Sequence, residues 1–353
     1  MNIGIYTTDE EYNANNGIFN LDLYKYAPDD IAYPYILLKN ELNRLGINLN
    51  TLDVYKKTNI KIDKMLFINF PTKHKKDLIE FYNQGVGLYL ILYENEVIRR
   101  DNWDKNNHRY FNKIFTWNPQ WANEKKYILI YLPIRIPENL DFHNLKKEKL
   151  LTVICWNKIR SHKKELYIER IRAMDWFNRY HPEDIDIYGM GWEKGVLRKF
   201  YWPFLGIPFS MRIIHLLEKI GPLHTLFRRP LKNYKGVVES KKEILGKYRF
   251  LLCYENAKDI PGYITEKIFH CFFAGCVPIY WGAPDIGKYI PENCFIDRRK
   301  FKNYEELYRF LIKMSDEDYK KYLLNIETYV KSQAIWQFSA ENFVNTVIKN
   351  ILS

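Results

Sequence analysis

The alternation of short apolar runs with amphipathic stretches is the feature that most restricts how this chain can fold. Both halves of the 353-residue sequence show it: apolar runs of strand length are separated by segments in which apolar residues recur at helical spacing. Strands that alternate with helices form βαβ units, and such units build parallel sheets. We therefore predict an α/β protein with two doubly wound, Rossmann-like domains that face a cleft.

Turn-forming residues mark the ends of the expected elements, as Gly46 and Pro71 do in the first half. In the first half, the expected strands are 2–6, 65–70, 87–93, 114–117 and 127–132, and the expected helices are 33–45 and one around 78–82. In the second half, the expected strands are 151–156, 185–188, 249–255 and 277–281, the expected helices are 165–179 and 266–274, and the region 304–352 is mostly helical.

A polar stretch with two prolines, residues 134–149, separates the two halves. Its composition is typical of an interdomain connection. The predicted division is an N-terminal domain at 1–145, a C-terminal domain at 146–335 and a terminal helical segment at 336–353.

Charge and cysteine content narrow the function classes. The net charge of +12 favours partners that carry phosphate, but the basic residues are spread along the chain, and no helix-turn-helix or RNP motif occurs, so nucleic acid is not the expected partner. The five cysteines show no zinc-binding spacing, which favours reduced, buried thiols and no metal site. Neither a signal-peptide pattern nor a run of about 18 apolar residues occurs, so we expect a cytoplasmic protein.

The segment 248–284 contains the strongest candidate for a ligand site. Its strand is followed by a loop and then by Thr265, which occupies a helix N-cap position directly before Glu266 and Lys267. In parallel sheets, ligands bind beyond the carboxyl ends of strands, and the free N–H groups at a helix start attract phosphate oxygens. Lys267 is unfavourable to the helix dipole, and a bound diphosphate would explain it. The alternative is an ordinary βαβ unit with a solvated Glu–Lys pair.

The same segment resembles the donor-binding signature of the α1,3-fucosyltransferases of glycosyltransferase family 10. The matching pieces are CYEN, GYITEKIF and AGCVPIYWG, in order and at the usual spacing. The resemblance implies a GT-B fold with an acceptor-binding N-terminal domain, a donor-binding C-terminal domain and a C-terminal helix that crosses back. It also implies transfer of L-fucose from GDP-fucose with inversion, without a metal or other cofactor, to an oligosaccharide hydroxyl such as O3 of N-acetylglucosamine or glucose.

The resemblance also implies roles for individual residues. Asn256 would face the donor sugar and Tyr263 the nucleotide sugar, Glu266 would bind the ribose hydroxyls, and Thr265 and Lys267 would hold the diphosphate. Glu255 would either contact the sugar or hold the loop. In the related segment 150–171, Arg170 would reach the diphosphate, with Lys163 as the alternative alignment. Lys235, in the related segment 233–245, is a further candidate for holding phosphate, against a solvated loop lysine.

The segment 88–118 resembles the acceptor-domain segment of the bacterial family members, in which the first Glu after the strand is the proposed general base. Here that residue is Glu94, and Glu96 is its rival. A carboxylate at the carboxyl end of a strand is well placed to accept the proton of an attacking hydroxyl. The alternative is a charged strand-end residue without a catalytic role.

The stretch 192–233 has no counterpart in this pattern and mixes aromatic, leucine and basic residues. Two interpretations stay open: a peripheral contact with the inner face of a membrane, near lipid-linked acceptors in glycan or lipopolysaccharide biosynthesis, and a helical flap on the donor domain. The oligomeric state cannot be inferred. The rival functions are a glycosyltransferase of the same fold that uses another nucleotide sugar, and a basic nucleic-acid-binding protein.

Overall fold

The computed structural model describes residues 1–24, 31–140, 142, 146–197, 228–238 and 240–353. These residues form two compact units. The first unit comprises Met1–Ile136, Pro261–Tyr263 and Ile335–Ser353, and the second comprises Pro137–Ile260 and Ile264–Ala334. The boundary therefore lies inside the proline-containing connection, and three residues of the segment 248–284 belong to the first unit.

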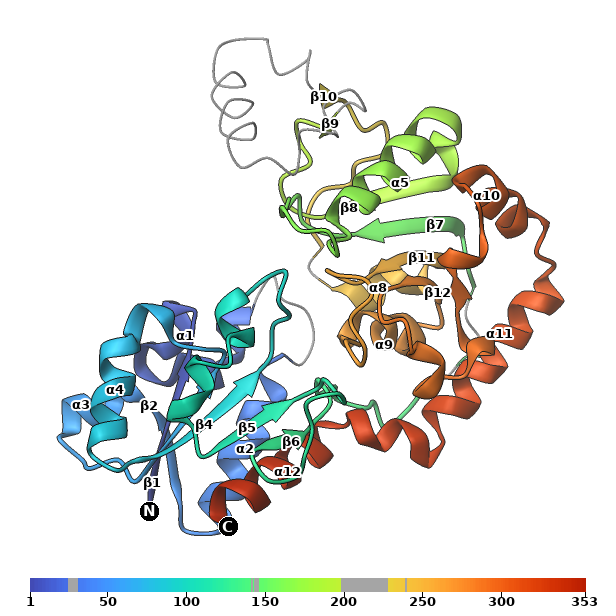
Figure 1. Ribbon diagram of the computed structural model, residues 1–353. Helices are drawn as coiled ribbons and strands as arrows, with labels where there is room; N and C mark the ends of the chain where they lie inside the picture. The colour runs from blue at the N-terminus through green and yellow to red at the C-terminus, as the bar shows by residue number, and fades with distance from the viewer. Residues whose placement is uncertain (25–30, 141, 143–145, 198–227, 239) are drawn as a thin grey trace. The chain divides into compact units, whose positions relative to one another are not determined.

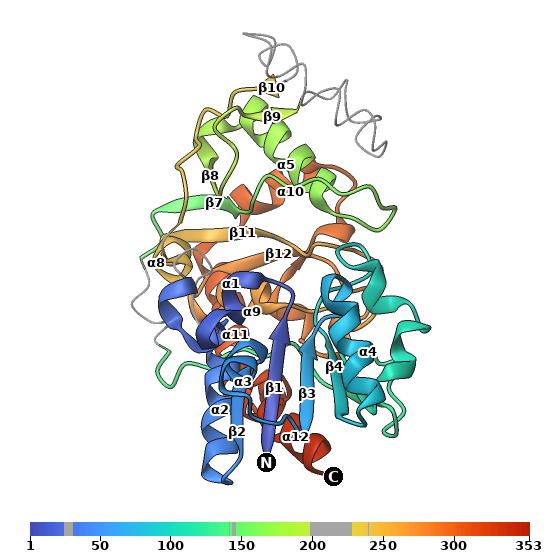
Figure 2. The same ribbon diagram turned by 90° about the vertical axis from the view of Figure 1, so that its left-hand side faces the viewer.

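The first unit is built on a parallel sheet with the strand order β2-β1-β3-β4-β5-β6 (Figure 2). Its strands are β1 (Asn2–Thr7), β2 (Asn48–Thr51), β3 (Lys64–Ile68), β4 (Gly87–Leu92), β5 (Lys113–Thr116) and β6 (Tyr127–Leu129). Its helices are α1 (Glu10–Asn13), α2 (Tyr33–Arg44), α3 (Leu52–Thr58), α4 (Lys75–Asn83) and α12 (Ala340–Leu352).

Alternation along the strands gives this sheet two apolar faces. On β3, Leu66 and Ile68 enter one buried cluster, whereas Met65 and Phe67 enter the other. Successive strand residues point to opposite faces, so a strand that is apolar throughout must be covered on both sides. Helices α2 and α12 contribute to the first cluster, and α3 and α4 contribute to the second.

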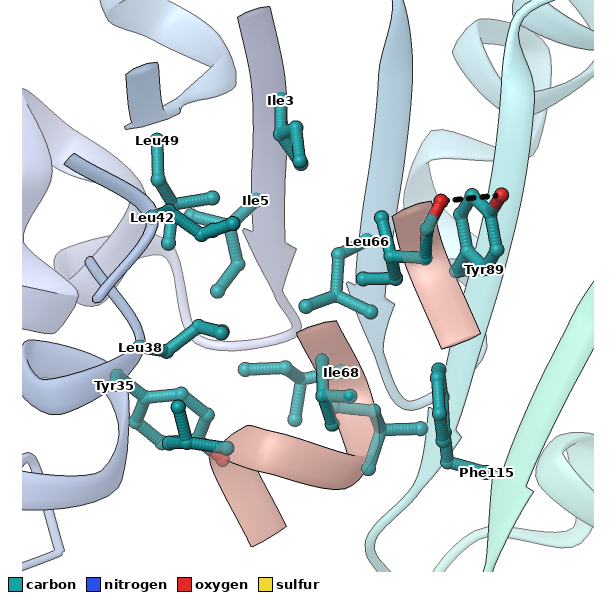
Figure 3. Packing of buried hydrophobic residues seen from close by; sticks show 14 of the residues in the cluster. Ile3, Ile5, Tyr35, Leu38, Leu42, Leu49, Leu66, Ile68, Tyr89 and Phe115 are labelled. Atoms are coloured by element: carbon teal, nitrogen blue, oxygen red, sulfur yellow. Dashed lines mark hydrogen bonds between the residues drawn. The ribbon is translucent and has the colours of Figure 1, made fainter. Parts of the chain in front are cut away.

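The C-terminal helix completes the first of these clusters. Phe343, Val344, Val347 and Ile351 of α12 are buried there among residues of β1, β3, β4 and β5. The Tyr89 hydroxyl on β4 donates to the Ile351 carbonyl at 3.1 Å, which fixes the end of the helix (Figure 3). The last residues of the chain therefore stabilise the sheet that begins with its first residues.

The second unit contains a parallel sheet with the order β13-β12-β11-β7-β8 (Figure 1). Its strands are β7 (Lys149–Ile154), β8 (Ile185–Tyr188), β11 (Tyr248–Tyr254), β12 (Val277–Trp281) and β13 (Ile296–Asp297), and a separate antiparallel pair is formed by β9 (Val196–Leu197) and β10 (Arg228–Arg229). Its helices are α5 (Tyr167–Tyr180), α8 (Lys241–Gly246), α9 (Glu266–Phe273), α10 (Tyr304–Lys313) and α11 (Asp316–Val330).

Short 3₁₀ helices connect these elements. They are η1 (Ala14–Phe19), η2 (Leu21–Tyr24), η3 (Thr72–His74), η4 (Arg100–Trp103), η5 (Asn107–Tyr110), η6 (Pro182–Asp184), η9 (Ile286–Lys288), η10 (Glu292–Cys294), η11 (Arg298–Lys300) and η12 (Gln333–Phe338).

The strand order of the second unit indicates where a ligand would bind. Its first strand, β7, lies between β8 and β11, so the connections leave β7 and β11 in opposite directions along the sheet. A doubly wound sheet opens a crevice at such a switch point, beyond the carboxyl ends of the two strands. The loops after Ile154 and Tyr254 are therefore the expected ligand-binding loops of this unit.

The predicted fold class is confirmed, because both units are doubly wound parallel α/β sheets. Each strand predicted from the sequence is present, with ends that differ by a few residues. Three elements of the first unit, α1, β2 and α3, are absent from the prediction, and β2 is absent because residues 48–51 (NLNT) contain no apolar run. Among the described residues, no helix is long and apolar enough to cross a membrane.

Truncating the α12 core residue Phe343 is expected to destabilise the first unit. Phe343→Ala removes a buried ring from the cluster beneath β1 and β3 and should lower the free energy of unfolding by about 3–5 kcal/mol. Asn345→Ala, at an exposed position of the same helix, should change it by about 0.5 kcal/mol or less. Urea denaturation of both variants provides the comparison, and equal midpoints would contradict the role assigned to α12.

Candidate functional site

The loop between β11 and α9 lies at the switch point of the second unit. Thr265 caps α9: its backbone is extended, and its hydroxyl oxygen accepts from the Lys267 N–H at 3.5 Å. The loops that follow β7 and β11 are joined by hydrogen bonds, because the Leu166 N–H donates to the Asn256 carbonyl at 3.1 Å and the Lys258 N–H donates to the Lys164 carbonyl at 2.8 Å. The sheet thus brings the two loops together.

The Glu255 carboxylate organises the start of α9. It is fully buried, and its oxygens accept from the Thr265 N–H at 2.9 Å, from the Thr265 hydroxyl at 2.8 Å and from Lys267 Nζ at 3.2 Å. A buried carboxylate is stable only when such donors surround it. These contacts join Glu255 to the end of the loop and to the first turn of α9.

Lys267 is part of this arrangement through its side chain. Its Nζ also donates to the Thr265 hydroxyl oxygen at 2.8 Å and lies 3.8 Å from Glu266 Oε1. Burial acts to lower the pKa of Lys267, but the Glu255 and Glu266 carboxylates outweigh it and raise that pKa. The buried carboxylate, without any ligand, is therefore a sufficient reason for a lysine in the first turn of α9.

Glu266 stays ionised for a related reason. Burial acts to raise the pKa of its carboxyl, but the charges of Lys267 and Lys241 lower that pKa to about 2. One turn along α9, burial and the charge of Lys241 lower the pKa of His270 to about 3, so its ring is neutral at neutral pH. The first turn of α9 therefore presents a fixed negative and a fixed positive charge.

Arg170 reaches the same edge of the sheet from α5. The Arg170 guanidinium is buried and donates to the Tyr254 carbonyl at 2.6 Å and to Asn256 Oδ1 at 3.1 Å. Its charge acts to lower the pKa of Lys267, against the larger effect of the two carboxylates. The structure thus brings Arg170 and Asn256 together with Glu255, Thr265, Glu266 and Lys267. The alternative cation, Lys163, is exposed.

Lys235, the further candidate for holding phosphate, lies apart from this cluster. Its Nζ is 3.6 Å from Asp186 Oδ1. The same carboxylate contacts Lys149 and accepts from the Tyr248 hydroxyl at 2.5 Å. Lys149 and Tyr248 begin β7 and β11, so this group lies toward the amino ends of the strands, whereas the α9 loop follows their carboxyl ends. The three positive and polar partners act to lower the pKa of Asp186, against the effect of burial.

Tyr263 packs in the first unit. Its ring is buried, and its centroid lies 4.9 Å from that of Trp117, which follows β5. Gly262 needs its small size there, because an added Cβ would lie 2.5 Å from the Trp117 carbonyl oxygen, and its φ of +73° is a conformation that glycine adopts without strain. Tyr263 thus belongs to the first unit and the α9 cluster to the second, although a single residue separates Tyr263 from Thr265 in the sequence.

Glu94 follows β4 in the first unit and is half-buried. Its backbone is fixed by side chains. The Glu94 N–H donates to Asn69 Oδ1 at 2.9 Å, and its carbonyl accepts from Asn102 Nδ2 at 3.1 Å and from Trp103 Nε1 at 3.0 Å. Glu96 lies in the following turn. These three partners could not be predicted from the sequence, because single Asn and Trp residues in loops form no recognisable pattern.

Most of the stretch 192–233, including Arg198, Lys199 and Arg212, lies outside the described residues. The membrane and flap interpretations of this stretch therefore also fall outside them. At its described end, Arg228 is buried and donates to the Gly195 carbonyl at 3.1 Å. Arg229 pairs with the buried Asp175 at 2.9 Å. These two arginines therefore serve the packing of α5 and the β9–β10 pair.

Comparison with known sequences links this region to one family. The model described as glycosyltransferase family 10 (fucosyltransferase) C-term matches residues 214–346, which include the cluster around Thr265. An α-(1,3)-fucosyltransferase of Helicobacter pylori is 36% identical over 110 residues, which are 31% of this chain and 20% of that protein. An α-(1,4)-fucosyltransferase of Arabidopsis thaliana is 36% identical over 70 residues, 20% of this chain and 17% of that protein. The chain thus matches about a fifth of the length of these relatives.

Comparison with solved structures concerns the fold. An α1,3-fucosyltransferase crystallised with GDP-fucose superposes with a TM-score of 0.52 at 16% identity, over 100% of this chain and 90% of that one. The Anabaena protein HepE, crystallised with UDP and glucose, gives 0.55 at 10% identity over 100% and 99%. At these identities, both similarities concern the fold and carry no information on activity. By sequence, residues 214–346 are thus similar to the C-terminal part of glycosyltransferase family 10 (fucosyltransferase).

Proposed function

We propose that this protein transfers L-fucose from GDP-fucose to a hydroxyl of an oligosaccharide acceptor, which we take to be O3 of N-acetylglucosamine or glucose. The observation that carries the proposal is the Thr265–Lys267 cluster: it lies at the switch point of a doubly wound sheet and within the region matched by the fucosyltransferase family. The product would form part of a glycan, a lipopolysaccharide or a glycoprotein.

The donor would bind to the cluster through its diphosphate. Lys267 has three N–H donors, and Glu255 and Thr265 take two of them, which leaves one for a phosphate oxygen. The Arg170 charge and the start of α9 add to the positive potential there. Glu266, kept ionised by its low pKa, would accept hydrogen bonds from the ribose hydroxyls, and Asn256 and Tyr263 would adjoin the sugar end of the donor.

Glu94 would act as the general base. Its carboxylate takes the proton of the acceptor hydroxyl as the hydroxyl oxygen bonds to the anomeric carbon and the bond from that carbon to the phosphate oxygen breaks. Attack opposite to the leaving group inverts the anomeric configuration. GDP departs with an added negative charge, which Lys267, Arg170 and the α9 N–H groups stabilise without a metal.

A different nucleotide sugar is the second candidate donor, because HepE shares the fold and was crystallised with UDP and glucose. The phosphate cluster would serve either donor. The shift in melting temperature with GDP-fucose, GDP-mannose and UDP-glucose separates the two proposals, since only the cognate donor should stabilise the protein strongly.

Replacing the proposed base should stop chemistry and spare donor binding. Glu94→Gln keeps the size of the side chain but cannot take a proton, so we expect transfer to fall by about 10²–10⁴-fold. The affinity for GDP, measured by calorimetry, should stay at the wild-type value. Glu96→Gln is the matched control and should retain transfer. Normal turnover of Glu94→Gln, or its loss in Glu96→Gln instead, would remove Glu94 from the role.

Removing the lysine of the cluster should weaken donor binding. A charge-assisted contact contributes about 1.5–3 kcal/mol, so Lys267→Ala should weaken GDP binding by roughly ten- to a hundredfold. That variant also leaves the buried Glu255 unpaired, so the double variant Glu255→Gln/Lys267→Met, which removes both charges, serves as the control for folding. Lys235→Ala should bind GDP normally, because its partner is Asp186. Equal losses in the Lys235 and Lys267 variants would contradict the site.

Donor affinity should be insensitive to pH near neutrality. The pKa of Glu266 is about 2 and that of Lys267 is raised, so both stay charged from about pH 5 to pH 8.5. Calorimetry with intact GDP-fucose, which has no terminal phosphate to titrate, should give a constant affinity. The rate of transfer should fall toward acid pH, because the base must be deprotonated. A tenfold change in donor affinity over this range would be inconsistent with the fixed charges.

A further inference from the structure

Glu94 is held in the first unit by a network of buried amide groups that is distinct from the strand ladder. Residue 94 comes after the last residue of β4, Leu92, so its peptide groups lie beyond the regular ladder. The network replaces the ladder: Asn69 accepts from the N–H of residue 94, and Asn102 and Trp103 donate to its carbonyl. Both peptide groups that flank the Glu94 side chain are therefore fixed.

Asn69 supplies the acceptor end of the network. It follows β3, the neighbour of β4, with a φ of +62°, a left-handed conformation that Asn tolerates better than most residues. Its N–H donates to the Ile91 carbonyl at 2.8 Å, which ties it to β4. Its Oδ1 then accepts from the N–H groups of Tyr93 and Glu94 at 3.1 and 2.9 Å and from Asn102 Nδ2 at 2.6 Å.

Asn102 closes the network from η4. Its side chain is fully buried, donates to Asn69 and to the Glu94 carbonyl, and accepts from the Phe70 N–H at 2.7 Å. The buried His108 ring donates from Nε2 to the Asn102 carbonyl at 2.7 Å. A buried amide of this kind is stable only when its donors and acceptors have partners, so its geometry is narrowly defined.

Trp103 joins the network to a cluster of rings. Its Nε1–H donates to Glu94, while its ring lies 5.0 Å from that of Trp117 and 4.9 Å from that of Trp121. Trp117 in turn donates from Nε1 to the Tyr93 carbonyl at 3.2 Å. Two neighbouring indoles therefore hold consecutive carbonyls of the loop that carries Glu94.

We infer that Asn69, Asn102 and Trp103 are positioning residues that fix the direction of the Glu94 side chain for proton transfer. The inference rests on the proposed function, because it assigns a purpose to rigidity at that residue. Rigid backbone on both sides of a base limits the positions that its carboxylate can occupy, and a displacement of about 1 Å can cost a hundredfold in rate. The base is thus held by neutral amides, which add no charge that would disturb its own titration.

Two near-isosteric variants test this inference. Asn102→Asp places an oxygen where Nδ2 donated to Asn69 and Glu94, and Trp103→Phe removes one N–H and keeps a ring in the cluster. We expect kcat to fall by about a hundredfold and about tenfold respectively, with GDP affinity unchanged. The controls are Asn118→Asp, in which Oδ1 still accepts from the Gln120 N–H, and Trp121→Phe in the same ring cluster; both should keep kcat within about twofold.

A second measurement does not depend on turnover. The Glu94 amide proton is bonded to Asn69, so Asn69→Ala should speed its hydrogen exchange by about tenfold or more, whereas the Leu90 amide inside β4 should exchange as in the wild type. The pH at which kcat/KM falls on the acid side should move in Asn102→Asp, which a simple loss of stability would not cause.

The outcomes separate the inference from the proposed function. Full activity of Asn102→Asp and Trp103→Phe, together with an inactive Glu94→Gln, would overturn the positioning role and leave the function intact. Transfer retained by Glu94→Gln would overturn the assignment of the base. In that case unchanged exchange of the Glu94 amide in Asn69→Ala would also refute the network as the restraint on residue 94, and faster exchange would support it.

Discussion

The ion pair between the buried Glu255 carboxylate and Lys267 is the interaction on which the arrangement at the start of α9 depends. A carboxylate without access to water costs several kcal/mol unless donors surround it, and here Thr265 and Lys267 supply them. Gly282 belongs to the same constraint, because a Cβ there would lie 2.5 Å from Glu255 Cγ. Glu255, Thr265, Lys267 and Gly282 are therefore held in place by one another.

The two units fix the loops at the carboxyl ends of their strands by different means. In the second unit, charges of opposite sign hold the loop after β11. In the first unit, neutral amides and indole N–H groups hold the loop after β4. Charged side chains are thus concentrated where an anion would bind. The residues that hold Glu94, the carboxylate that would accept a proton, are uncharged.

The sequence predicted those parts of the molecule in which local pattern and tertiary structure agree. The apolar runs of β1, β3, β4, β11 and β12 are buried on both faces and could form nothing but central strands, and Thr265 was recognised because an N-cap has a local pattern. β2 could not be predicted, because this edge strand is largely polar and lacks an apolar run. The pairing of Lys235 with Asp186 and the amide network of Asn69 join residues far apart in the sequence, which no local spacing reveals.

The place of α12 has a consequence for synthesis on the ribosome. The strands of the first sheet are translated before the second unit, but the helix that covers one apolar face of that sheet is translated after the second unit. The second unit, whose segments lie between these two ends, can complete its core sooner. One apolar face of the first sheet therefore stays uncovered by α12 while the whole second unit is synthesised, and it is an apolar surface that a chaperone can bind.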